Sequence, residues 1–255
     1  MFCYRMITRI LCQYQNLLRL IYVNDHYIHN LKENTVRYKT RFRRVFNYFA
    51  DKKGFMKQVN ISPGNSKMGA IPSVSLPAGL TCRTDCECFT KCYARKIERL
   101  RPNVHNCYAQ NYSILKEDPE RYFREIEGAI MASRFFRWHV SGDIVDIGYL
   151  TSMVSIAERN QHCEMLCFTK RYDIVNEFIK QGRVIPGNLH IIFSAWRGIE
   201  MINPYGLPEA HVNYRDGYTT AANNAQKCGG NCTECAISNG GCWKLKHGEQ
   251  IVFNE

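Results

Sequence analysis

The sequence lacks the features that assign many proteins to a class at first sight. It contains no uninterrupted apolar run approaching the roughly 20 residues that a membrane-spanning helix needs, so we expect no contact with a membrane. A Walker loop, a dinucleotide-binding fingerprint and a nucleophile elbow are also absent. Phosphate binding by a P-loop, dinucleotide binding and catalysis by a hydrolase serine are therefore not indicated.

The sequence also lacks a good secretory signal. Its N-terminal apolar stretch is interrupted by Arg5, Arg9 and Arg19, and no small-residue cleavage site follows it. We therefore expect a cytoplasmic protein. Because the cytoplasm keeps thiols reduced, the 13 cysteines indicate metal ligands or redox groups rather than a disulfide framework.

Acidic residues are few relative to basic ones: 23 Asp and Glu stand against 34 Lys and Arg, giving a net charge of +11. The excess is concentrated in residues 1–56, where eleven Lys and Arg face three acids, a net charge of +8. We expect this segment to be a basic leader that is poorly ordered, or that precedes a true start at Met56. Nucleic acid is its expected partner, since a basic arm attracts phosphates.

Residues 57–221 have the pattern of an α/β domain. Three short apolar runs, "FFRWHVSGD", "CEMLCFTKR" and "NLHIIFSAW", are continuous, as in parallel strands buried on both faces. Helix-like segments follow the first two runs, so the sequence predicts a partial parallel (β/α) barrel or an open parallel sheet. Working residues in such folds lie at the C-terminal ends of the strands. Here these ends are Ser141–Asp143, Thr169–Arg171 and Ser194–Arg197.

Four cysteines follow the candidate strand "IPSVSLP" within eleven positions: Cys82, Cys86, Cys88 and Cys92. Closely spaced thiolates are soft ligands that favour zinc or an iron–sulfur cluster. A single residue separates Cys86 from Cys88, so joint ligation by both would be strained. We predict a three-thiolate site of Cys82, Cys88 and Cys92. Three thiolates on a [4Fe–4S] cluster leave one iron open, as a catalytic centre requires.

Residues 222–255 form a second cysteine-rich segment, the tail. Cys228, Cys232 and Cys235 have the spacing that holds three irons of a [4Fe–4S] cluster, and Cys242 could complete the set. A tetrahedral four-cysteine zinc site is equally consistent with the same residues. Few apolar side chains lie between these cysteines, so we expect metal binding to fix a loop here.

Several stretches of the chain resemble a phage family called gene product 88. They are "GNSKMGAIPSVSLPAGLTC", "CYARK", "RWHVSGD", "FTKRY", "IIFSAW" and "GNCTEC" with "GCWKLKHGE", and the stretch that contains them runs from about residue 60 to 253. The resemblance implies a phage-encoded protein in the host cytoplasm. It supplies little chemistry, because the family is poorly characterised.

The order of motifs is also similar to that of radical S-adenosylmethionine enzymes. In those enzymes a three-cysteine loop follows the first strand of a partial barrel. A glycine-rich turn ending in an acid follows the second strand and holds the amino group of the cofactor. This resemblance implies that Gly142 and Asp143, in "SGD", position S-adenosylmethionine. The cysteine spacing of three, one and three residues departs from the three and two usual in that class.

Two functions from different classes follow. The first is an iron–sulfur protein resembling radical S-adenosylmethionine enzymes, with a substrate that the sequence does not indicate. The second is a zinc-stabilised nucleic-acid-binding protein without catalysis, which the basic leader and the aromatic and basic residues near Trp196 favour.

Overall fold

The computed structural model describes residues 57–85 and 87–255. The expected leader, residues 1–56, and Cys86 lie outside the described residues. Within the described part of the chain, no helix is long and apolar enough to cross a membrane.

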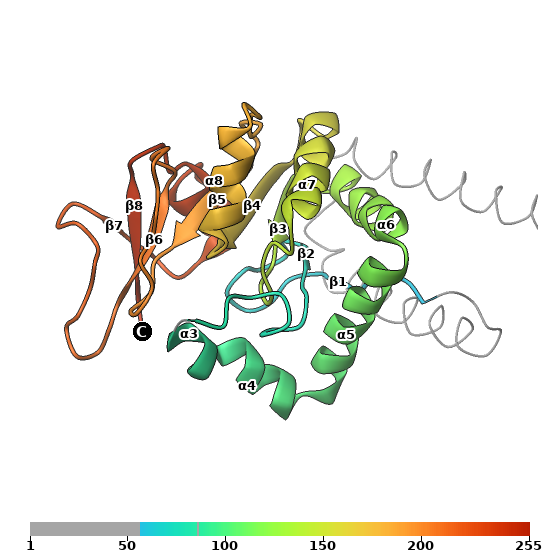
Figure 1. The fold of residues 1–255 in the computed structure, drawn as a ribbon, viewed down its shortest axis with the longest axis horizontal. Coiled ribbons are helices and arrows are strands. Elements are labelled where there is room, and N and C mark those ends of the chain that lie inside the picture. Colours follow the sequence, from blue (N-terminus) through green and yellow to red (C-terminus); the bar gives the residue numbers. More distant parts are fainter. Residues whose placement is uncertain (1–56, 86) are drawn as a thin grey trace, which may run out of the picture. The chain divides into compact units, whose positions relative to one another are not determined.

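An eight-stranded sheet with the order β1-β2-β3-β4-β5-β6-β8-β7 organises the described residues (Figure 1). Only the edge strand β1 is antiparallel to its neighbour, and every other pairing is parallel. The predicted α/β class with a parallel sheet is thus confirmed, with one antiparallel edge. The strands are β1 Ile61–Ser62, β2 Ser73–Val74, β3 Phe135–Trp138, β4 Glu164–Thr169, β5 Leu189–Ser194, β6 Glu209–Asn213, β7 Gln226–Lys227 and β8 Gln250–Asn254.

Local sequence signals account for the start of α6 and the end of α8. Asp118 caps α6 by accepting a 3.0 Å hydrogen bond from the backbone N–H of Arg121, and Pro119 takes the first helical position. Gly182, with φ +77°, follows the end of α8. The helices are α3 Glu87–Thr90, α4 Tyr93–Leu100, α5 Pro102–Glu117, α6 Pro119–Met131, α7 Ile147–Arg159, α8 Tyr172–Lys180, α9 Cys232–Ile237 and the 3₁₀ helix η2 Gly241–Trp243.

The two faces of the sheet are covered by different parts of the chain. Residues of α5, α6, α7 and α8 pack on one face, together with Phe136, Met165 and Ile191 of the central strands. The opposite face presents Leu166 and Ile192, and it packs against Ala236, Trp243 and Leu245 of the tail. Adjacent residues of β4 and β5 therefore contribute to different cores, because successive side chains of a strand point to opposite faces.

A reversal in strand order explains this division. The strands β3, β4, β5 and β6 are neighbours in chain order, whereas the chain steps backwards from β7 to β8. Crossovers between parallel strands are right-handed in nearly all proteins. A backward step therefore places its connection, residues 228–249, on the face opposite the helices. The tail is not only the loop that the sequence suggested, since it contains β7, α9 and β8.

Asn111 of α5 attaches the first strands to the helical layer. Its side chain is fully buried, accepts a 2.6 Å hydrogen bond from the N–H of Asn60, and donates to the carbonyls of Asn60 and Ser75 at 3.0 Å each. The Asn111 side chain therefore provides hydrogen-bond partners for three backbone groups at one edge of the sheet.

We predict that Asn111→Ala lowers the free energy of unfolding by about 1–3 kcal/mol, because buried backbone groups lose their partners. Urea denaturation of the full chain measures the change. Asn106→Ala is the matched control, since Asn106 is exposed on the same helix, and its effect should stay within about 0.5 kcal/mol. Equal effects of the two substitutions would contradict this role of Asn111.

Candidate functional site

The two cysteine groups line one cavity of about 980 Å³. The floor of this cavity is the sheet face opposite the helices, with side chains from β3, β4, β6 and β8. The turn at Ser141–Asp143 and the strand-end residues Lys170, Ser194 and Trp196 line it as well. All seven cysteines that the sequence predicts as metal ligands lie here: Cys82, Cys88, Cys92, Cys228, Cys232, Cys235 and Cys242.

The first cysteine group is arranged at the start of α4. Cys92 occupies the N-cap position of this helix. A hydrogen bond from Cys88 lowers the pKa of the Cys92 thiol to about 6, against the effect of burial, and the backbone N–H groups of Ala94 and Arg95 contribute. Burial raises the pKa of Cys82. Cys92 is thus the cysteine of this group best suited to be a thiolate at neutral pH.

The second group is held by short helices in the tail. Cys232 and Cys235 are three positions apart on α9, so they share one side of the helix. Cys242 lies in η2, where burial and, to a smaller extent, the neighbouring Cys228, Cys232 and Cys235 together raise its pKa to about 12. A Cβ on Gly241 would lie 2.8 Å from Sγ of Cys235. Glycine at this position therefore allows the two segments to approach.

The predicted cofactor-binding turn lies against the first cysteine loop. Gly142 has φ +83°, and a Cβ there would come within 2.7 Å of the Leu76 side chain and 2.8 Å of Oγ1 of Thr81. The N–H of Asp143 donates to the same Thr81 hydroxyl at 3.1 Å. Only glycine fits this position without a shift of the loop that leads to Cys82.

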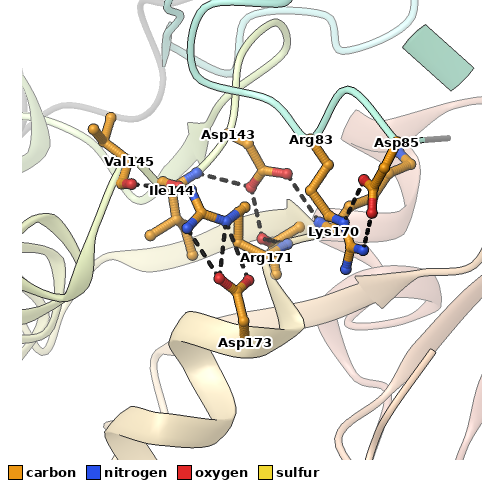
Figure 2. A network of polar contacts seen from close by, with 9 residues as sticks. Arg83, Asp85, Asp143, Ile144, Val145, Lys170, Arg171 and Asp173 are labelled. Carbon is orange, nitrogen blue, oxygen red and sulfur yellow. Dashed lines mark hydrogen bonds and ion pairs between the residues drawn. The ribbon is translucent and has the colours of Figure 1, made fainter. Parts of the chain in front are cut away.

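The carboxylate of Asp143 joins the turn to the end of β4 (Figure 2). It accepts hydrogen bonds from the Thr169 hydroxyl at 2.6 Å, the N–H of Lys170 at 2.9 Å and the N–H of Ile144 at 2.8 Å. Burial raises its pKa, and these donors oppose the rise. Its Oδ2 accepts one of these hydrogen bonds, from Lys170, so a carboxylate oxygen retains capacity for a further donor. Recognition of a cofactor by Asp143 stays a prediction.

Arg171, which follows the end of β4, has a structural role instead of an open binding function. Figure 2 shows its guanidinium paired with Asp173 at 3.0 Å and donating to the carbonyls of Ile144 and Val145 at 3.3 and 3.0 Å. The Arg171 side chain therefore joins the backbone that follows Asp143 to the segment between β4 and α8.

Glu98 is a site residue that the sequence did not reveal. It is buried on α4, and its Oε1 accepts hydrogen bonds from the N–H of Ala78 at 2.9 Å and from the Ser141 hydroxyl at 3.3 Å. This carboxylate connects the helix after Cys92 to the turn at Ser141–Asp143. The sequence feature that could have indicated Glu98 is its position four residues after Ala94, because both residues then lie on the buried face of α4.

Metal binding at either cysteine group stays a prediction. Within residues 57–85 and 87–255, no group of three or more His, Cys, Asp or Glu side chains is placed to hold a metal ion. No two cysteines of this part of the chain form a disulfide. The choice between Cys86 and Cys88 as ligand is also open, although Cys88 lines the cavity.

We predict that Gly142→Ala lowers the free energy of unfolding by about 1–3 kcal/mol, since a side chain there is strained by the backbone and meets Leu76 and Thr81. Chemical denaturation of the full chain is the measurement. The control is Gly128→Ala within α6, where an added Cβ meets nothing within 4 Å. Alanine there should raise stability by roughly 0.5–1 kcal/mol. A neutral or stabilising Gly142→Ala would contradict the proposed fit of the turn.

Comparison with known proteins agrees with the resemblance seen in the sequence. The model of the family described as gene product 88 matches residues 47–242, which is most of the chain. No curated protein and no solved structure matches the chain. The chain therefore belongs to the gene product 88 family.

Proposed function

We propose that this chain is an iron–sulfur protein that resembles radical S-adenosylmethionine enzymes. The observation that carries the proposal is that both cysteine groups and the turn at Ser141–Asp143 line one cavity at the sheet. A parallel sheet with a cysteine loop after one strand and an acidic turn after the next matches the motif order of that enzyme class.

The first cysteine group would supply the ligands of an open cluster. Cys82, Cys88 and Cys92 would hold three irons of a [4Fe–4S] cluster, and the lowered pKa of Cys92 favours ligation, because the thiolate is the binding form. When bound, such a cluster supplies an electron for reductive cleavage of S-adenosylmethionine.

The chain's own residues would orient the reactants. Glu98 and Thr81 hold the turn against the cysteine loop, and Gly142 allows the turn to lie close to Leu76 and Thr81. Asp143 would accept a hydrogen bond from the cofactor's amino group. Apolar side chains of the sheet face, such as Leu166 and Val212, would exclude water from the cavity.

The tail group would hold a second centre. Cys228, Cys232, Cys235 and Cys242 supply four thiols, which suit either a [4Fe–4S] cluster or zinc. A single zinc ion would require all four sulfurs at about 2.3 Å from it, whereas a cluster spans a larger volume. Either centre would close the cavity on the side of the tail.

A zinc-stabilised nucleic-acid-binding protein without catalysis is the second candidate. Its specific support is a group of cations stacked on aromatic rings near the strand ends. Lys170 lies 5.2 Å from the ring centre of Trp196, and Arg197 lies 4.6 Å and 4.4 Å from those of Tyr214 and Tyr218. Such pairs are typical of surfaces that bind single strands.

The test is metal analysis of the anaerobically purified full chain. We expect a coloured protein with about four irons per cluster, and release of 5′-deoxyadenosine when S-adenosylmethionine and a reductant are added. The double variant Cys82→Ser, Cys92→Ser should lose the iron of the first group and the cofactor cleavage. Cys107→Ser is the matched control, since Cys107 lies on α5 and does not line the cavity.

A colourless protein with about one zinc per chain and salt-dependent DNA or RNA binding would instead establish the second candidate. Iron content unchanged by the double variant would reject the assignment of the first group.

A further inference from the structure

Among the strand residues that form the floor of the cavity, one side chain is charged. The described strand residues that line it come from four parallel strands and from the end of β5: Arg137, Leu166, Phe168, Ser194, Ala210, Val212, Ile251, Phe253 and Asn254. Arg137, in β3, is the only charged residue among them. A partly buried arginine on an otherwise apolar sheet face requires an explanation, because a charged group withdrawn from water usually has a partner.

Arg137 has few polar partners in the described part of the chain. Its Nε donates to the carbonyl of Trp138 at 3.1 Å, and its guanidinium lies 4.4 Å from the ring centre of Phe168. No acidic side chain of the described residues pairs with it, in contrast to Arg159, which forms a bidentate pair with Glu127. A guanidinium has five N–H donors. The terminal nitrogens of Arg137 are thus available to a ligand in the cavity.

The remaining charged groups that line the cavity are predominantly cationic. They are Lys67, Arg83, Arg95, Arg101 and Lys170 against Asp143 and Glu255. The carboxylate of Asp143 is engaged with the end of β4, and that of Glu255 accepts a hydrogen bond from the N–H of Arg215. Arg83 is itself paired with Asp85, and a Cys92 thiolate would add one negative charge. The lining still holds more cations than anions, so the field in the cavity favours an anion.

We propose that the cavity binds an organic anion whose carboxylate or phosphate is held by Arg137 and whose apolar, planar part lies against Phe168 and the sheet floor. A guanidinium recognises either group through two parallel hydrogen bonds. The volume of about 980 Å³ suits a small molecule, at the upper end of the usual range of roughly 300–1,000 Å³. This inference goes beyond the proposed function and does not depend on which metal the cysteines bind.

A competing role for Arg137 is to balance the charge of the tail thiolates. Burial raises the pKa values of Cys232 and Cys242, and the positive charge of Arg137 opposes both rises. The experiment must therefore separate ligand binding from metal retention.

Isothermal titration of the anaerobically purified full chain with three probes makes this separation. The probes are 1-naphthyl phosphate, 1-naphthoate and the neutral 1-naphthylmethanol, which share the planar part and differ in the polar group. We expect at least one anion to bind about tenfold or more tightly than the alcohol, as a charge-assisted hydrogen bond implies. Whichever anion binds more tightly identifies the chemical group that the cavity prefers.

Substitutions then test Arg137 itself. Arg137→Met should remove the preference for the anion, and Arg137→Lys should retain part of it. Arg183→Met is the matched control, because Arg183 also lies over an aromatic ring, 4.0 Å from the ring centre of Phe178, but does not line the cavity. It should bind the probes as the unsubstituted chain does.

Three results would overturn the inference: equal affinity for all three probes, no binding of either anion, or an unchanged preference in Arg137→Met. Loss of metal from Arg137→Met with the anion preference intact would assign Arg137 to charge balance instead. If Arg137→Met does not fold, the comparison of probes on the unsubstituted chain decides. Metal content is measured on the same samples, so failure of the proposed function is read separately from failure of this inference.

Discussion

The parallel pairing of β8 between β6 and β7 is the constraint on which the rest of the site depends. Parallel neighbours cannot be joined by a tight turn, so the chain must cross a face of the sheet between them. Because the step from β7 to β8 runs backwards, this crossing lies opposite the helices. The four tail cysteines are thereby brought over the strand residues that form the cavity floor, next to the loop that carries Cys82 and Cys92.

The cavity has two supports of different kinds. On one side, Glu98, Thr81 and Asp143 fix the cysteine loop, the turn and the end of β4 through buried hydrogen bonds. On the other side, packing of Trp243 and Leu245 on the sheet holds the tail. Buried polar networks fix geometry more sharply than apolar contacts do. The turn is therefore the more precisely positioned side of the cavity, as a site for orienting a ligand requires.

Local patterns made part of this arrangement predictable. The continuous apolar runs indicated the central parallel strands, and Asp118 and Pro119 marked the start of α6. The strands β6 and β8 carry no comparable local signal, and their pairing depends on contacts across the chain. Every cysteine of the cavity could be named as a candidate ligand from local spacing, but the meeting of the two groups could not. The position of Arg137 in the cavity had no local signal, because its neighbours across the sheet, Ser73 and Leu166, come from distant segments.

The order of the cavity's parts along the chain has a consequence for biosynthesis. Cys228 follows Cys92 by 136 positions, so a ribosome working at about 5–20 residues per second completes the first thiol loop on the order of 10 s before the segment that covers it. Leu166 and Ile192 are made within that interval, so their apolar face of the sheet is synthesised before the tail residues that pack on it. Any ligand of the cavity would therefore have freer access before the tail is made than after it.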